Sequence, residues 1–289
     1  MKTVVIAGAT GYLGAYLVAH YKQQGWAVRA LVRSTAAAHT KGLDATEFFE
    51  GEATNAATLM GLMEDVDLVV SALGITRQKD GLTYHDVDYR ANKNLLDLAV
   101  ENSVPQFAYI HVLNATKLLN VELVHAKQHF VKTLQAAPIK STVISPSGYF
   151  SDLEDFLNMA KSGRVYVFGS GKYRINPIHG KDLAAACYEI ISSEQTFAEV
   201  GGPTKYTHNE LAEIAFKSLN KKARITHLPN WISVAAQKIL ETFTSAKTYG
   251  PIQFFLSAMR MDMVGKCYGR IRLEDHFAEV LNKETQNNT

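Results

Sequence analysis

Cysteine is scarce in this sequence: the 289 residues include only two, Cys187 and Cys267, and their spacing is not that of a metal site. A disulfide framework needs cysteines in larger, paired sets, so we expect reduced thiols and a cytoplasmic protein. The ten histidines also lack ligand pairs such as His-Glu-x-x-His. The sequence therefore predicts no metal site.

Long apolar runs and a strong net charge are missing as well. No stretch reaches about 18 consecutive apolar residues, so we expect no membrane-spanning helix. The first apolar run, residues 4–6, fits a buried strand, so we expect no secretion signal. The formal net charge is only +2, which argues against a dedicated nucleic-acid-binding protein. Two locally basic clusters, within 217–224 and 260–272, are expected to be solvated faces.

The most informative segment that is present follows the first apolar run. Gly8, Gly11 and Gly14 stand in the spacing Gly-x-x-Gly-x-x-Gly, and an amphipathic segment begins directly after them. Strand, tight turn and helix in this order suit a dinucleotide pyrophosphate. Gly8 permits the turn, Gly11 lets main-chain N–H groups approach the phosphates, and Gly14 lets the helix pack against the strand. The helix N-terminus adds unpaired donors and a positive dipole end. We assign the cofactor contacts of this loop to six residues: Gly8, Thr10, Gly11, Tyr12, Leu13 and Gly14.

Strand and helix patterns alternate through the first half of the chain. Besides the first strand, we expect strands at 26–32, 45–50, 67–72, 107–112 and 141–145, and helices at 88–101 and 121–135. This alternation predicts an α/β fold, a Rossmann-type doubly wound parallel sheet that binds ligands at the carboxyl ends of its strands.

The pattern changes after residue 146. Glycine-punctuated loops and helices follow, with helical patterns at 182–192, 209–219 and 230–262 and an expected frayed tail at 284–289. We predict an NAD(P)-binding domain of residues 1–147, to which 177–200 return. The remaining residues, 148–176 and 201–289, are expected to form a smaller, mainly helical substrate or lid region.

The end of the second predicted strand bears on the choice of cofactor. NAD-specific sites place an acidic residue there to bind the ribose 2′-hydroxyl, and this sequence has none. Arg33 offers a fork of donors that suits a phosphate, Ser34 adds a hydroxyl, and Arg29 could point the same way. We therefore expect NADP(H) in preference to NAD(H). Three residues at the end of the fourth strand are expected to pass close to the adenine-side ribose: Ala72, Leu73 and Gly74.

Several segments together resemble a known superfamily. They include Gly-Ala-Thr-Gly-Tyr-Leu-Gly at 8–14, Asp-Tyr-Arg-Ala-Asn-Lys-Asn-Leu-Leu at 88–96, Ser-Pro-Ser-Gly-Tyr-Phe at 145–150 and Ile-Asn-Pro-Ile-His-Gly-Lys-Asp-Leu-Ala at 175–184. The chain resembles the short-chain dehydrogenase/reductases over residues 1–230. More narrowly, it resembles their atypical branch, which contains the NmrA-like proteins, the isoflavone-reductase-like enzymes and the 39-kDa subunit of respiratory complex I.

The standard catalytic site of this superfamily is incomplete in the sequence. That site combines a serine with Tyr-x-x-x-Lys on the helix after the fifth strand, where the lysine eases deprotonation of the tyrosine. Tyr89 and Lys93 have this spacing, but their helix follows the fourth strand, so we reject them. The helix in the right place carries Lys127, with Leu123 where the tyrosine should stand. His111 stands near the expected serine.

The resemblance implies two different roles for such a protein. Some reductases of the atypical branch lack the tyrosine and keep the lysine. Lys127 is then expected to bind the nicotinamide ribose and to help protonate the substrate. His111 or His125 could supply a proton. Tyr149 is expected near the nicotinamide, and Pro146 is expected to contact the cofactor. This leading hypothesis is an NADP(H)-dependent reductase of a small molecule. Aromatic residues in the later helices suggest an apolar substrate: Trp231, Phe243, Phe254 and Phe255.

The alternative hypothesis is a protein that binds NADP(H) but does little chemistry, as described for NmrA-like regulators and the complex I subunit. Such a sensor or assembly protein would act through a protein partner. A nucleotide-sugar epimerase is a third hypothesis, and it is disfavoured because that chemistry generally relies on the missing tyrosine.

Overall fold

The computed structural model describes residues 1–75, 81–243 and 246–287. The chain divides into two compact units. The first consists of Met1–Ser145 and Ala184–Ala198, and the second of Pro146–Leu183 and Glu199–Thr289. The domain boundaries expected from the sequence remain a prediction about independently folding parts.

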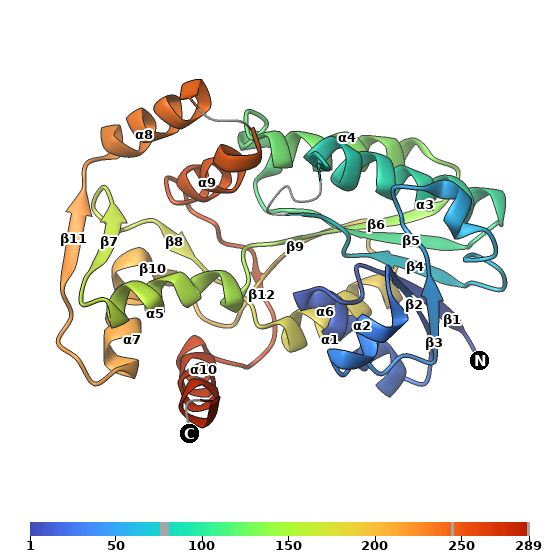
Figure 1. Ribbon diagram of the computed structural model, residues 1–289, viewed down its shortest axis with the longest axis horizontal. Helices are drawn as coiled ribbons and strands as arrows, with labels where there is room; N and C mark the ends of the chain where they lie inside the picture. The colour runs from blue at the N-terminus through green and yellow to red at the C-terminus, as the bar shows by residue number, and fades with distance from the viewer. Residues whose placement is uncertain (76–80, 244–245, 288–289) are drawn as a thin grey trace. The chain divides into compact units, whose positions relative to one another are not determined.

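The first unit is built on a parallel sheet (Figure 1). Its strands are β1 (Thr3–Ala7), β2 (Ala27–Val32), β3 (Glu47–Glu50), β4 (Leu68–Ser71), β5 (Gln106–Ile110) and β6 (Lys140–Pro146). They lie in the order β6-β5-β4-β1-β2-β3, and the pairings between them are parallel. The chain runs outward from β1 in one direction and then from β4 in the other. The strand order therefore reverses between β1 and β4, where a doubly wound sheet opens its ligand crevice.

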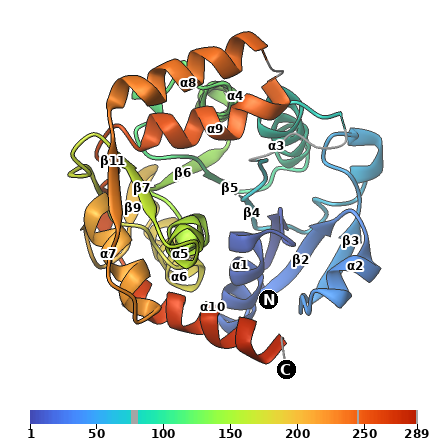
Figure 2. The same cartoon turned by 60° about the vertical axis from the view of Figure 1, so that its left-hand side comes forward.

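Helices cover both faces of this sheet. Figures 1 and 2 show α3 (Asn92–Glu101) and α4 (Glu122–Ala136) on one face and α1 (Tyr12–Gln23) on the other. The shorter elements are α2 (Thr35–Thr40), η1 (Ala56–Leu59) and η3 (Ala115–Lys117). Phe107 and Tyr109 of β5 pack against Phe130 of α4 in the core. Val5 and Ile6 of β1 are fully buried, as expected for a parallel strand covered on both faces. The predicted Rossmann-type α/β fold is confirmed.

The segment predicted as one helix at 88–101 is interrupted. A π-helical turn, η2 (His85–Ala91), precedes α3. The Asn92 side chain donates to the carbonyls of Val87 and Asp88, at 3.1 and 3.2 Å. A side chain that inserts into the main-chain ladder in this way favours the wider turn, and π turns of this kind are frequent at functional sites.

The second unit is mainly helical. Its helices are α5 (Glu154–Lys161), α7 (His208–Ser218), α8 (Asn230–Phe243), α9 (Ala246–Ala258) and α10 (Leu273–Asn287), with the short η4 (Phe150–Leu153). α6 (Gly180–Ser192) and β9 (Phe197–Gly201) each begin in one unit and end in the other. Two small sheets pair β7 (Val165–Phe168) with β11 (Ile225–Leu228) and β8 (Arg174–Ile175) with β10 (Tyr206–Thr207), and β12 (Lys266–Cys267) pairs with the end of β9. Figure 2 shows α8 and α9 side by side.

One expectation for this region holds over most of its length, and another is wrong in part. The helical pattern at 230–262 comprises two helices, α8 and α9, and residues 244–245 between them lie outside the described part of the chain. The frayed tail expected at 284–289 is wrong for residues 284–287, which belong to α10. Leu273 and Phe277 bury one side of α10, and Glu284 pairs with Lys161 at 2.6 Å. Residues 288–289 lie outside the described chain.

Three further features bear on the class of protein. Both cysteines are free, Cys187 buried and Cys267 exposed. In the described ranges, no cluster of three or more His, Cys, Asp or Glu residues is placed to hold a metal ion. None of the helices in the described part of the chain has the length and apolar character that a membrane span requires.

Candidate functional site

The glycine-rich turn between β1 and α1 forms a close-packed backbone cradle. Gly8 has φ +79°, a left-handed conformation that favours glycine, and its carbonyl accepts a 2.9 Å hydrogen bond from the Gly11 N–H. A Cβ on Gly8 would lie 2.8 Å from the Ala72 carbonyl oxygen, and one on Gly14 would lie 2.0 Å from that of Gly8. A side chain at either Gly8 or Gly14 would therefore occupy the space in which two backbone segments now make contact.

The N-terminus of α1 begins directly after this cradle. Gly11 is its N-cap, no side chain of the described residues caps it, and its first turn carries no acidic residue. The donors and the dipole of this helix end therefore suit an anionic group. Backbone cradle, uncapped helix start and the reversal of strand order together fit the pyrophosphate of a dinucleotide cofactor.

The end of β2 carries the residues expected to choose the cofactor. Arg33 is exposed, and Ser34 caps α2 by accepting a 3.3 Å hydrogen bond from the Ala37 N–H. The carboxylate of Glu50, at the end of neighbouring β3, accepts a 2.9 Å hydrogen bond from the Thr35 N–H. Hydrogen bonds from Thr35 lower the pKa of Glu50. A carboxylate therefore lies beside this turn, although the sequence of β2 itself contains none.

Arg29 does not join this group. Its Nε pairs with Glu47 at 2.7 Å, and its Nη1 donates to the carbonyls of Leu62 and Glu64, both at 2.8 Å. The expectation that Arg29 points toward the same phosphate is wrong because these contacts tie it to β3 and the 62–64 turn.

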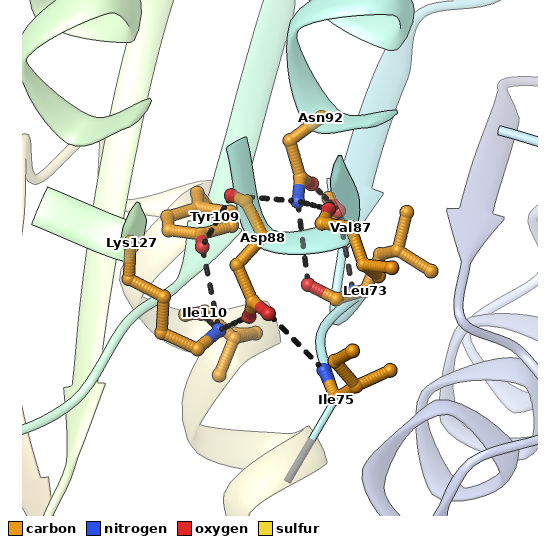
Figure 3. A network of polar contacts seen from close by, with 9 residues as sticks. Leu73, Ile75, Val87, Asp88, Asn92, Tyr109, Ile110 and Lys127 are labelled. Carbon is orange, nitrogen blue, oxygen red and sulfur yellow. Dashed lines mark hydrogen bonds and ion pairs between the residues drawn. The ribbon is translucent and has the colours of Figure 1, made fainter. Parts of the chain in front are cut away.

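Lys127 lies in a buried polar network at the carboxyl ends of β4 and β5 (Figure 3). Its Nζ is 3.2 Å from Asp88 Oδ1 and donates to the Tyr109 hydroxyl at 3.3 Å and the Ile110 carbonyl at 3.4 Å. Asp88 is fully buried, and Lys127 is 9% exposed. The other Asp88 oxygen accepts a hydrogen bond of 3.4 Å from the Ile75 N–H. The π turn, α4 and the loop after β4 thus meet at one ion pair.

Burial dominates the electrostatics of this network. It raises the pKa of Asp88 from its ordinary 3.8 to about 6, against the opposing effect of the Lys127 charge. It also raises the pKa of Tyr109 to about 12, which is opposite to what a catalytic tyrosine requires. Burial, reinforced by Lys127, lowers the pKa of His111 to about 4. The His111 ring, which contacts Gln128 Oε1 at 3.0 Å through Nε2, is therefore neutral at pH 7.

Residues 72–74 connect the glycine cradle to the Lys127 network. Ala72 approaches Gly8, as described above, and its N–H donates to the Ala7 carbonyl at 3.0 Å. A Cβ on Gly74 would lie 2.6 Å from Asp88 Oδ1 and 2.9 Å from Lys127 Nζ. The backbone after β4 therefore contacts both the cradle and the ion pair, so the structure brings the glycine loop, this segment and Lys127 together.

Asn92 and Ser71 hold residues 72–74 in place through hydrogen bonds. Ser71 Oγ lies 2.5 Å from Asn92 Oδ1, and Asn92 Nδ2 donates to the Leu73 carbonyl at 3.4 Å. Asp88 and Asn92 are the residues that sequence reasoning missed. Their spacing could have revealed them: Asp88 and Asn92 share one helical face with Leu95 and Ala99, all of them buried.

The remaining predicted residues lie elsewhere. Pro146, buried at the end of β6, and half-buried Tyr149, the N-cap of η4, belong to the second unit, and their roles stay predictions. His125 is exposed on α4. In the rejected pair, Lys93 binds Asp97 at 2.6 Å and Tyr89 stacks on the His129 ring.

The aromatic residues of the later helices differ in exposure. Trp231 is 68% and Phe255 is 38% exposed, while Phe254 is half-buried. The side chain of Phe243 lies outside what the structure describes.

The parallel sheet, its reversal of strand order and the glycine cradle define the Rossmann-type fold of the short-chain dehydrogenase/reductases. More particularly, the model of the NmrA-like family matches residues 1–268, and the chain belongs to this family. The resemblance predicted from the sequence is therefore confirmed.

The relatives of this chain include a protein named as a reductase and one named as an assembly factor. The chain is 26% identical over 322 aligned positions to divinyl chlorophyllide a 8-vinyl-reductase of Arabidopsis thaliana, covering 97% of this chain and 77% of that protein. It is 25% identical over 246 positions to the photosystem II assembly factor Ycf39 of Synechocystis, covering 83% and 74%.

Solved structures share the fold. The NADPH-dependent quinone oxidoreductase QOR2 of Escherichia coli, complexed with NADPH, superimposes with a TM-score of 0.77 and 18% identity, over 96% of this chain and 100% of that one.

Proposed function

We propose that this chain is a cytoplasmic NADP(H)-dependent reductase of a small, apolar electron acceptor, with Lys127 as its catalytic residue. One observation carries the proposal: residues 72–74 contact both the glycine cradle and the buried Lys127–Asp88 pair. A cofactor whose pyrophosphate lies on the cradle would extend along the carboxyl ends of β4 and β5, where Lys127 lies.

The residues present fit such a cofactor. The cradle and the start of α1 would hold the pyrophosphate, and Arg33 at the end of β2 would pair with the 2′-phosphate that distinguishes NADP(H). When bound, the reduced nicotinamide supplies the hydride. The proposal of an apolar acceptor rests on the sequence alone, on the aromatic residues Trp231, Phe254 and Phe255 of the later helices.

The chain's own chemistry would come from Lys127. Its ammonium would stabilise negative charge that develops on an acceptor oxygen, in a site where burial strengthens the interaction. It would then donate a proton to that oxygen, and solvent would return one to Nζ. His111 is neutral at pH 7 because of its low pKa, so it would hydrogen-bond to a ligand rather than protonate it.

Turnover tests this proposal. Purified protein is mixed with NADPH and a panel of quinones, enones and aldehydes, and loss of the reduced nicotinamide absorbance is followed. We expect oxidation of NADPH with at least one acceptor, and a loss of about a hundredfold or more in Lys127→Ala. Lys93→Ala is the matched control, because Lys93 is an exposed lysine paired with Asp97. Full activity in Lys127→Ala contradicts the proposal.

A second candidate function is an NADP(H)-binding sensor or assembly protein that acts through a protein partner. The complete burial of Tyr109 and the low pKa of His111 favour it, since burial shields the Tyr109 hydroxyl from a ligand and the His111 ring is neutral at pH 7. Tight binding of NADPH without turnover of any acceptor supports this function over the reductase.

A further inference from the structure

Two lysine–aspartate pairs occur on neighbouring helices of the first unit, and they differ in environment. Lys93 and Asp97 form an exposed pair within α3, with side chains 41% and 48% exposed. Lys127 and Asp88 come from different elements, and their side chains are 11% and 0% exposed. An exposed pair contributes little to stability, and a buried pair carries a large desolvation cost. Stability alone therefore does not account for the buried pair.

The buried pair is enclosed on several sides (Figure 3). Asp88 accepts the Ile75 N–H through one oxygen and faces Lys127 through the other. Lys127 Nζ also contacts the Tyr109 hydroxyl and lies 5.1 Å from the centre of its ring. The backbone of Gly74 lies so close that a Cβ there would meet both charged groups. The ammonium is therefore directed by Asp88 toward the backbone that follows β4.

We propose that Asp88 is a positioning residue, whose buried carboxylate holds the Lys127 ammonium beneath Gly74 and keeps it charged. The positioning role of Asp88 rests on the proposed function only where the Lys127 ammonium is given a part in a reaction. Asp88 does not touch a substrate; it acts through Lys127.

The charged groups around Asp88 determine the pH range in which its carboxylate can position Lys127. Among the described residues, the titratable groups that face Asp88 are Lys127 of α4 and Tyr109 of β5, and His111, directly after β5, is affected by the Lys127 charge. Tyr109 and His111 are uncharged at pH 7. Because the pKa of Asp88 is about 6, its carboxylate is present at neutral pH and is lost below.

The first test measures the reactivity of the Lys127 amine and requires no catalytic turnover. The protein is exposed to an amine-acylating reagent at pH 8, and acylation of Lys127 is followed by mass spectrometry. Only the neutral amine reacts, so loss of the carboxylate in Asp88→Asn should accelerate acylation at least about tenfold. Asp88→Glu should restore slow acylation, and the control Asp97→Asn should leave the Lys127 rate unchanged. An equal rate in Asp88→Asn and wild type overturns the proposal.

A second variant covers the case in which Asp88→Asn does not fold. Gly74→Ala places a methyl group against both members of the pair but keeps both charges. We expect faster acylation of Lys127, because the carboxylate and the ammonium must separate. An unchanged rate in this variant also overturns the proposal.

Wild-type protein separates this proposal from the proposed function. Saturating NADPH should slow acylation of Lys127 if that lysine binds the cofactor. Absence of protection contradicts the role of Lys127 in the proposed function, whereas the Asp88→Asn result still decides whether Asp88 positions the lysine. Where turnover is found, its wild-type rate should fall below about pH 6, and Asp88→Asn should lack this inflection.

Discussion

Replacing Gly14 by alanine adds one methyl group at the start of α1 and tests the packing of the cradle. An alanine inside a helix is ordinarily more favourable than glycine by about 1 kcal/mol. Here the new Cβ would lie 2.0 Å from the Gly8 carbonyl oxygen, 2.7 Å from its carbon and 2.8 Å from the Ala9 Cα. These neighbours are backbone atoms, so no side chain can rotate away.

The size of the effect follows from that geometry. Contacts below 3.0 Å are essentially never seen for a real Cβ, so the start of α1 must move away from the Gly8–Ala9 turn by about 1 Å. Overpacking typically costs about 1–3 kcal/mol and occasionally more. A 2.0 Å contact with backbone atoms places this substitution at the upper end, above the gain in helix propensity. We expect Gly14→Ala to lower the free energy of unfolding by at least about 2 kcal/mol.

Gly11→Ala is the matched control. Its Cβ would lie 3.2 Å from the same Gly8 oxygen, and its φ of −80° is ordinary. We expect a loss of stability of about 1 kcal/mol, from the poorer N-cap, together with weaker NADPH binding. Urea unfolding with analysis of midpoint and slope separates the two variants. Wild-type stability in Gly14→Ala would refute the argument that this glycine is required by close packing.

Three further predictions concern the cofactor, pH and a helix end. Arg33→Ala should weaken NADPH binding about tenfold or more and NADH binding little, whereas equal losses in calorimetry contradict the phosphate assignment. Because the pKa of Asp88 is raised, its ionisation destabilises the fold between about pH 4 and 6. As the pH rises across that window, the free energy of unfolding of Asp88→Asn should therefore increase relative to that of wild type, by up to about 3 kcal/mol. A difference between the two proteins that does not change with pH in urea unfolding counts against it. Thr207→Ala removes the capping box with Glu210 and should cost about 1 kcal/mol; an unchanged urea midpoint would show that the cap is not needed.

The start of the fold could be predicted because its signals are local. Residues 4–7 are all buried, and an apolar run followed by a glycine triplet leaves few structures open to the chain. The positive φ of Gly8 and the close approach at Gly14 are the features that this spacing predicts. The fold class followed from the same kind of pattern, repeated along the first half of the chain.

Arg29 shows where local reasoning fails. An arginine in the middle of a strand, as Arg29 is in β2, is equally suited to a phosphate and to backbone carbonyls. Its partners Leu62 and Glu64 are more than 30 residues away in sequence, so nothing near Arg29 indicates which it contacts. Glu50 is the converse case: its carboxylate reaches Thr35 only because β3 pairs with β2.

The missing catalytic tyrosine shows both what local spacing can predict and what depends on contacts between distant residues. Spacing shows correctly that no tyrosine stands four residues before Lys127, yet the structure places the Tyr109 hydroxyl 3.3 Å from its Nζ, from the adjacent strand β5. Proximity alone would suggest that Tyr109 replaces the absent residue. Its complete burial argues the opposite, because a phenol with a pKa of about 12 neither loses its proton at neutral pH nor reaches a ligand. The chemistry of the pair therefore depends on the environment of the hydroxyl, and the group that directs Lys127 is the carboxylate of Asp88.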